Sequence, residues 1–249
     1  MTNLFSIVFA VPLECESCVK SVSGALDNIN GIDNYDVDLK QNTVKTHGSV
    51  APSEIVRAIQ GVGKDAVIRG TGAPNSAAVC IMESFDEKDK STPVKGLARI
   101  VSVGEKDVVI DLTMNGLNKG VYYPSIRTSG NLSRAPFSTG RLFYELAPVD
   151  VSTPADESTV ILSLGSLDTS SKSNSFSGQA FLQGKLDIND LIGRSMILSR
   201  IKDEISPDSL CGVIARSAGI WENNKQVCSC TGKSLWQERT DSILKGIRT

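Results

Sequence analysis

The chain of 249 residues has a single histidine, His47, and this excludes several kinds of catalytic site. A catalytic zinc centre built from several imidazoles, or a Ser/His/Asp triad, needs more histidine than this chain offers. His47 stands at the end of a predicted strand with no second ligand near it in the sequence, so we interpret it as a turn residue. Chemistry in this chain therefore has to come from other side chains.

Clusters of positive charge and long apolar runs are also missing. Lys plus Arg (26) nearly balances Asp plus Glu (28), and no segment is strongly basic, so no nucleic-acid or anionic-membrane partner is expected. No apolar run approaches the roughly twenty residues that span a bilayer. The opening run "LFSIVFAVPL" lacks the basic flank of a signal peptide, so secretion is not expected either.

Cysteines are the most informative residues that the chain does have. An even count in a secreted chain suggests a disulfide framework, but six is sparse for this length, and four of them form two close pairs at opposite ends. Such pairs are typical of thiol sites in a reducing compartment, which predicts the cytoplasm. Cys80 and Cys211 are predicted to be buried hydrophobic residues, with a reactive Cys211 as the alternative. The six are Cys15, Cys18, Cys80, Cys211, Cys228 and Cys230.

The first seventy residues alternate between strand and helix periodicity. Residues 5–11, "FSIVFAV", are apolar and β-branched as in a strand, and apolar residues recur at helical spacing over residues 18–29. Two alternating runs around residues 41–42 predict a hairpin, residues 52–54 begin a second helix, and "KDAVIRG" predicts a final strand. The order is β-α-β-β-α-β, which predicts a ferredoxin-like domain over residues 1–70.

Cys15 and Cys18 fall in the loop after the first strand and on the first turn of the first helix. The helix dipole and the free N–H groups there favour anions, so both thiols are expected to ionise more readily than a free cysteine. Two thiolates three residues apart can bind one soft ion, and the lack of a nearby histidine favours Cu(I) over tetrahedral zinc. A thioredoxin-like redox pair and two incidental cysteines at a helix start are the alternatives.

The segments "PLECESC" and "GKDAVI" resemble the heavy-metal-associated domain of copper chaperones, whose motif is Met-x-Cys-x-x-Cys. Leu13 stands where the motif has methionine, a residue that supports the metal loop from its apolar side. Lys64 matches the lysine that in many such domains lies close to the metal and offsets the charge of a Cu(I) bis-thiolate. An ordinary turn lysine is the alternative for Lys64. The resemblance implies a Cu(I) site at Cys15 and Cys18, supported by Leu13 and Lys64.

Residues 71–77 are rich in Gly, Pro, Asn and Ser, which predicts a linker. Beyond it, about eight short apolar or alternating runs separated by Gly, Pro and Ser turns predict an all-β barrel or sandwich. This second domain is expected to cover residues 78–222. Its segments "VKGLARI", "LIGRSMILSR" and "LCGVIARSAG" resemble Cu/Zn superoxide dismutase, and the resemblance implies a Greek-key β-barrel.

The metal-binding positions of that enzyme are not kept in this chain. Ser125 and Arg127 stand at the alternating histidines of its first copper-binding strand, and Ser199 stands at its last copper histidine. Its substrate-guiding arginine corresponds to Asp208, and Cys211 matches one half of its internal disulfide without a partner cysteine. A barrel without imidazole ligands cannot cycle copper in the enzyme's manner, so no superoxide dismutase activity is expected.

The dimer interface of the enzyme includes the strand that corresponds to residues 212–226 here. Because a two-fold interface is self-complementary, a related chain that keeps this patch can replace one subunit. The resemblance therefore implies a heterodimer with a superoxide dismutase subunit, docked around Ile214, Arg216, Gly219 and Trp221. Trp and Arg are frequent interface anchors, which favours docking over the alternative that this strand serves only as core and turn.

Residues 223–249 surround Cys228 and Cys230 with Ser, Gly and Asn, which predicts a short flexible tail. Cα atoms two residues apart in an extended chain are separated by roughly 6 to 7 Å, so an internal disulfide would be strained and readily exchanged. The two thiolates can instead share a soft ion or attack a sulfur atom of another protein.

In this order the three parts resemble the fungal copper chaperone for superoxide dismutase across nearly the whole chain. The resemblance implies a metallochaperone that takes up Cu(I) at Cys15 and Cys18 and uses Cys228 and Cys230 to complete copper insertion and oxidation of the client's disulfide. It also implies a cytosolic protein, with a fraction in the mitochondrial intermembrane space in some members. The upstream copper donor and self-association of the free protein stay open. A thiol-disulfide oxidoreductase without copper transfer, and a paralogue that only regulates the enzyme's level, are the alternative functions.

Overall fold

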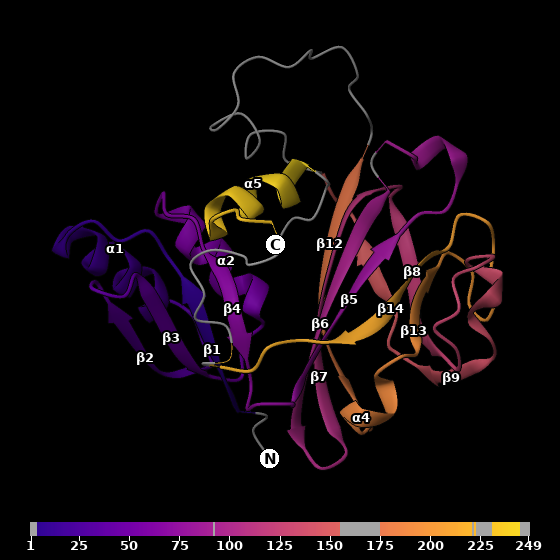
Figure 1. Cartoon of the computed structure of the whole chain (residues 1–249), viewed down its shortest axis with the longest axis horizontal. Helices are drawn as coiled ribbons and strands as arrows, with labels where there is room; N and C mark the ends of the chain where they lie inside the picture. Colours follow the sequence, from indigo (N-terminus) through magenta and orange to yellow (C-terminus); the bar gives the residue numbers. More distant parts are fainter. Residues whose placement is uncertain (1–3, 92, 155–174, 221, 223–230, 245–249) are drawn as a thin grey trace.

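Two domains lie side by side, with a C-terminal helix between them (Figure 1). The structure is a computed structural model, and none of the helices it describes is long and apolar enough to cross a bilayer. The described residues are 4–91, 93–154, 175–220, 222 and 231–244.

The first domain is a four-stranded antiparallel sheet with two helices, in the strand order β2-β3-β1-β4. Apolar positions that repeat at helical spacing in both helices belong to one buried cluster with this sheet, which is why the two segments are stable as helices. The predicted β-α-β-β-α-β order is confirmed. Its elements are β1 (Phe5–Ala10), α1 (Glu16–Asp27), β2 (Ile32–Asp38), β3 (Thr43–Gly48), α2 (Pro52–Gly61) and β4 (Val67–Thr71).

The second domain is all-β, as predicted, and its strands pair antiparallel in the order β10-β8-β13-β14-β5-β6-β7-β12-β11, with β9 on β8. Its strands are β5 (Ala77–Glu83), β6 (Val94–Gly104), β7 (Asp107–Leu117), β8 (Gly120–Arg127), β9 (Leu142–Glu145), β10 (Val149–Val151), β11 (Thr153–Pro154), β12 (Phe176–Gly184), β13 (Ser195–Ser199) and β14 (Leu210–Arg216). Short helices are η1 (Glu87–Asp89), η2 (Phe137–Thr139) and α4 (Ile188–Leu191).

The resemblance implies a closed barrel. Among the described residues, however, the hydrogen-bonded pairing of the strands does not close into a ring. Strands β10 and β11 stand at the two ends of the pairing path, although only one residue separates them in the sequence. The chain itself, at residue 152, therefore connects the two ends of the sheet.

The outer face of this sheet is apolar where the first domain covers it. Val101 of β6 and Val109 of β7 belong to the same buried cluster as Phe5 and Ile7 of β1. The ring centroids of Phe5 and Phe181, one from each domain, lie 6.4 Å apart. Successive residues of a strand point to opposite faces, so these outward-facing side chains are buried by the other domain and not by the barrel interior.

A buried polar network crosses the same interface. Asp111 of β7, only 1% exposed, accepts hydrogen bonds from the backbone N–H (2.9 Å) and the hydroxyl (2.5 Å) of Ser53. Ser53 lies in the first turn of α2, whose N-cap residue, Ala51, has no side chain that could cap the helix. The carboxylate of the second domain therefore caps a helix of the first. Arg99 of β6 lies 3.7 Å from Asp111 and completes the network.

The connection between the domains is crossed by the segment that follows β14. The backbone N–H of Thr71 donates to the carbonyl of Ala218 (3.2 Å), and that of Ile220 donates to the carbonyl of Gly72 (2.9 Å). A Cβ atom at Gly219 would lie 2.6 Å from the carbonyl oxygen of Ala73, so only glycine fits at this crossing. Residues 72–76, within the predicted linker, separate β4 from β5.

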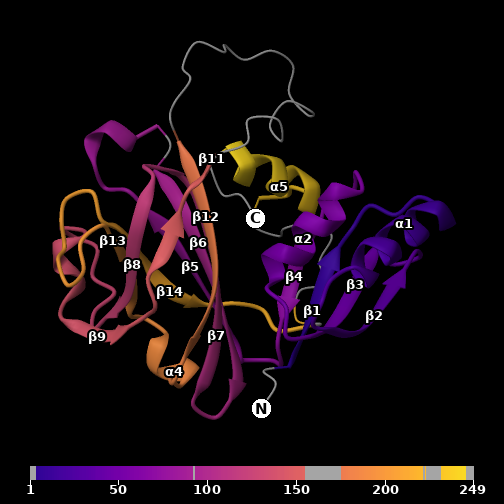
Figure 2. The same ribbon diagram turned by 180° about the vertical axis from the view of Figure 1, so that it is seen from behind.

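The C-terminal helix α5 (Leu235–Leu244) lies near α2 and β4 in both views (Figures 1 and 2). The prediction of a flexible tail over residues 223–249 is therefore wrong for these ten residues. The segment "LWQERTDSIL" has no clear apolar stripe, so periodicity gives no helix signal there.

Candidate metal site and docking face

The metal loop, residues 11–15, leads from the end of β1 into α1. Cys15 is the N-cap residue of α1 and is exposed, whereas Cys18 lies in the first turn and is buried. Their Sγ atoms are 3.7 Å apart. Both sulfur atoms can therefore contact one soft ion, and one of them is open to an incoming ligand.

Hydrogen bonds at the start of α1 lower the pKa of Cys15 from its ordinary value of 9.0 to about 7. The largest cause is the Ser17 hydroxyl, which lies 2.9 Å from Cys15 Sγ, followed by the backbone N–H groups of Cys18 and Ser17. These groups stabilise the thiolate, which is the form that binds metal and reacts as a nucleophile.

Alkylation of Cys15 in the copper-free chain should show this low pKa directly. We expect the rate with iodoacetamide to rise with pH around a midpoint near 7, because only the thiolate reacts. Ser17→Ala removes the largest stabilising hydrogen bond, so its midpoint should move upward toward 9.0. Mass spectrometry of the Cys15 peptide in a Cys18→Ser background gives the rate. Ser21→Ala, which removes only a hydroxyl bonded to the Ser17 carbonyl, is the control; equal midpoints in the two variants would contradict the assignment.

Leu13 belongs to the metal loop, and its side chain is buried in the same cluster as Cys18. Its backbone N–H donates to the side-chain oxygen of Asn42 (2.9 Å), and the N–H of Val11 donates to the carbonyl of Asn42 (3.0 Å). Asn42, in a positive-φ turn (φ 55), thus holds the first half of the loop, from Val11 to Leu13. The sequence analysis placed this residue in a hairpin turn but did not connect it with the metal site.

Lys64 lies in the loop between α2 and β4, where its backbone N–H donates to the carbonyl of Ile59 (3.3 Å). Within the part of the chain that the structure describes, its side chain has no hydrogen bond to either cysteine of the site. A role for Lys64 in offsetting the charge of bound copper therefore stays a prediction.

The other two described cysteines are buried in the second domain, and Cys80 belongs to its core cluster. Burial raises the pKa of both Cys80 and Cys211 to about 12, so neither is a thiolate at neutral pH. Both behave as small hydrophobic residues, as predicted, and the alternative of a reactive Cys211 is not supported.

The positions of the enzyme's copper ligands contain short polar contacts. Ser199 Oγ lies 3.2 Å from Ser209 Oγ, and the guanidinium of Arg127 donates to the carbonyl of Gly140 (3.0 Å). Nowhere in the described ranges do three or more His, Cys, Asp or Glu side chains form a group that could hold a metal ion.

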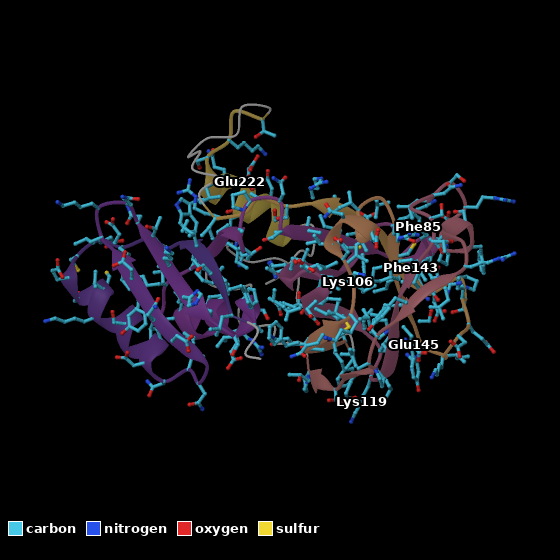
Figure 3. The ribbon with its side chains drawn as sticks, turned by 90° about the horizontal axis from the view of Figure 1, so that it is seen from below. Phe85, Lys106, Lys119, Phe143, Glu145 and Glu222 are labelled. Carbon is cyan, nitrogen blue, oxygen red and sulfur yellow. The ribbon has the colours of Figure 1, made fainter. Side chains whose placement is uncertain are left out.

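Part of the outer face of β5 and β14 is apolar and uncovered. Ile81 of β5 is 40% exposed and Val213 of β14 is 36% exposed, while the alternating neighbours Cys80 and Ile214 are fully buried. Cys80 and Ile214 are register partners in the two strands, so Ile81 and Val213 point to the opposite, outer face. Phe85, beyond the end of β5, is also exposed, on the part of the second domain remote from the first (Figure 3).

The structure describes three of the four predicted docking residues. Ile214 was wrongly predicted to lie on the surface, because its side chain points into the core and Val213 occupies the outer face. Gly219 contacts the chain's own linker, so the structure gives it an internal role. Arg216 is exposed at the end of β14. Trp221 lies outside the described residues, and so do Cys228 and Cys230.

The fold and the site define a soft-metal-binding protein, with two thiols on a ferredoxin-like domain joined to an all-β domain. The model of the heavy-metal-associated domain matches residues 8–65. The chain is 64% identical to the superoxide dismutase 1 copper chaperone of Debaryomyces hansenii over 100% of both chains. It is 40% identical to that of Saccharomyces cerevisiae, over 99% of this chain and 98% of the relative. The chain therefore belongs to the family of copper chaperones for superoxide dismutase.

Among solved structures, the chain is similar to the copper(I)-loaded first domain of the human copper chaperone for superoxide dismutase 1. The two are 32% identical, and the match covers 28% of this chain and 97% of that one, with a TM-score of 0.27.

Proposed function

We propose that this copper chaperone binds Cu(I) through Cys15 and Cys18 and delivers it to superoxide dismutase 1. The observation that carries the site is the 3.7 Å separation of the two sulfur atoms, one exposed and one buried. A second thiol can approach the exposed sulfur, so copper can pass between proteins by exchange of sulfur ligands without being released as a free ion. The protein acts as a metallochaperone and not as a catalytic enzyme.

We propose that docking uses the uncovered outer face of β5 and β14, with a superoxide dismutase subunit as partner in a heterodimer. Ile81 and Val213 supply exposed apolar area on this face, and the exposed Arg216 ends strand β14. The first domain covers the neighbouring part of the same sheet face, at β6, β7 and β12. Docking places the copper site beside the client at a high effective concentration.

The finer steps of the proposal concern the tail. Cys228 and Cys230 are proposed to complete copper insertion and to form the client's disulfide by thiol–disulfide exchange, with oxygen as the final electron acceptor. We place the activity in the cytoplasm, with a fraction in the mitochondrial intermembrane space as in some members of the family.

A reconstitution tests the function. The Cu(I)-loaded chain is mixed with copper-free, disulfide-reduced superoxide dismutase 1 in excess Cu(I) chelator and oxygen, and client activity and client disulfide are measured together. We expect both to appear, because ligand exchange inside a complex protects copper from the chelator. If the disulfide forms while copper stays with the chelator, the chain is a thiol-disulfide oxidoreductase and the copper proposal fails.

Two variants separate docking from copper binding in that experiment. Val213→Asp places a charge in the apolar docking face and should weaken the complex by about 1 to 3 kcal/mol, the usual range for an important interface residue. Asn115→Asp, in β7 and outside the proposed face, is the control for added charge. Equal dissociation constants for the two variants, measured by titration calorimetry, would place the docking face elsewhere.

A further inference from the structure

A cleft of about 290 Å³ lies where helix α5 meets both domains. Its walls come mainly from β4 of the first domain, from β5 and β6 of the second, and from α5, which lies between the domains in Figures 1 and 2. This volume is close to the lower end of the range of roughly 300–1,000 Å³ that is usual for small-molecule sites. No residue of the metal loop or of α1 lines the cleft, so it is separate from the copper site.

Arg99 of β6 lines this cleft with a guanidinium that lacks hydrogen bonds. Its side chain is only 11% exposed, and Nη1, which is buried, lies 3.7 Å from the carboxylate of Asp111, beyond hydrogen-bond distance. Nε and Nη2 are not buried, and neither donates a hydrogen bond to a residue that the structure describes. Because a largely buried cation without hydrogen bonds is costly, these donors point to a ligand in the cleft.

A second guanidinium lines the cleft from helix α5. Arg239, whose side chain is also 11% exposed, donates to Asp65 through Nε (3.3 Å) and Nη2 (3.5 Å), which leaves its Nη1 without a hydrogen bond in the described part of the chain. Burial lowers the pKa of Arg99, the charge of Asp111 opposes this effect, and the positive charge of Arg239 adds to it. The two guanidinium groups therefore lie close enough to repel each other, and an anion between them would stabilise both.

The remaining walls of the cleft are mostly apolar. Of the described residues that line it, only Glu238 is acidic, and its Oε1 accepts a hydrogen bond from the hydroxyl of Thr231 (2.8 Å). An inorganic anion would leave the apolar side chains uncovered, whereas an organic anion would bury part of their surface. The apolar side chains are those of Val67, Ile68, Val79, Leu97 and Leu235.

We propose that this cleft binds a small organic anion, a phosphate monoester whose head lies between Arg99 and Arg239 and whose short apolar body lies against these walls. The planar fork of an arginine matches two phosphate oxygens at once, and two guanidinium groups match the charge of a dianion. Arg99 belongs to the second domain and Arg239 to α5. A bound ligand therefore joins the helix to the second domain, in addition to the pair with Asp65 that links it to the first.

Calorimetric titration of the full copper-free chain with phenyl phosphate, at constant ionic strength, tests this site. We expect one saturable site, and binding of inorganic phosphate that is weaker by about fivefold or more, because the ion does not cover the apolar walls. Arg239→Gln should raise the dissociation constant for phenyl phosphate about tenfold, since it removes charged donors. Arg134→Gln, a change at an exposed arginine of the second domain, is the matched control and should leave the constant as it is.

Arg99→Lys separates binding from folding. Lysine keeps a positive charge near Asp111 but loses the planar fork, so the chain should remain folded while phenyl phosphate binds about tenfold more weakly. Circular dichroism and Cu(I) binding at Cys15 and Cys18 provide the controls, and both should be the same as in the intact chain.

Three results would overturn this inference. The intact chain could show no saturable binding of phenyl phosphate, or Arg239→Gln and Arg99→Lys could bind it as tightly as the intact chain, which would place the anion elsewhere. Equal dissociation constants for phenyl phosphate and inorganic phosphate would show that the apolar walls take no part, and the assignment of an organic anion would then be wrong. None of these results affects the proposed delivery of copper, which does not use this cleft.

Discussion

A chain that carries Cys228→Ser and Cys230→Ser is expected to lose activation of superoxide dismutase 1 completely. Serine oxygen is a poor ligand for Cu(I), and serine cannot form a disulfide. The variant is therefore expected to lose both proposed roles of the tail, copper insertion and formation of the client's disulfide. Cu(I) binding at Cys15 and Cys18 should persist, because their two Sγ atoms lie 3.7 Å apart and can contact one ion without the tail. Docking should persist as well, since the outer face of β5 and β14 is unchanged.

Three measurements on that variant check the expectation: client activity, the dissociation constant for the client, and Cu(I) competition against a chelator. Ser229→Ala, the residue between the two cysteines, is the control for disturbing the tail without removing sulfur. Full activation by the double variant would show that the first domain alone delivers copper, and the tail would then need another role.

Asp111→Ala is expected to lower the free energy of unfolding by about 3–5 kcal/mol, the cost of removing one partner from a buried charged pair. The change leaves Arg99 buried without its carboxylate and leaves α2 without the oxygen atoms that accept from Ser53. Burial already lowers the pKa of Arg99, and the charge of Asp111 opposes that effect. Loss of Asp111 should therefore weaken the contact between the domains as well as total stability.

Urea unfolding, followed separately in each domain, measures this effect. Combining Asp111→Ala with Arg99→Met removes the unpaired charge, so the double variant should be more stable than Asp111→Ala alone. A loss below about 1 kcal/mol for Asp111→Ala would mean that water reaches the network and that other contacts hold the two domains together.

Much of the first domain could be predicted because its helices and strands differ in apolar period, and because the two cysteines fall at a helix start. The same reasoning fails for strand β14, which contains the predicted docking residues Ile214 and Arg216. In "LCGVIA" both faces are apolar, one facing the core and one facing outward, so alternation gives no indication of which residue is exposed. The sequence analysis chose Ile214, whereas Val213 is the exposed residue.

Two other features of the structure could not be predicted from the local sequence pattern. Helix α5 is linked to the first domain by a pair between Arg239 and Asp65, which are 174 residues apart in sequence. Asp111 did leave a signal, a lone carboxylate within the apolar run "VVIDLTM", since a buried charge requires a partner. That signal predicts an unknown contact, but only the packed domains show that the partner is the start of α2.

The capping of α2 by Asp111 limits how far the metal-binding part can be treated as a module. An isolated fragment ending at residue 71 would begin its second helix with free N–H groups and would expose Phe5, whose ring packs near Phe181 in the whole chain. Such a fragment should be less soluble and less stable than a heavy-metal-associated domain that occurs alone. Exchange of this domain between chaperones, in evolution or in engineering, therefore requires the matching residues of the sheet to be inherited with it.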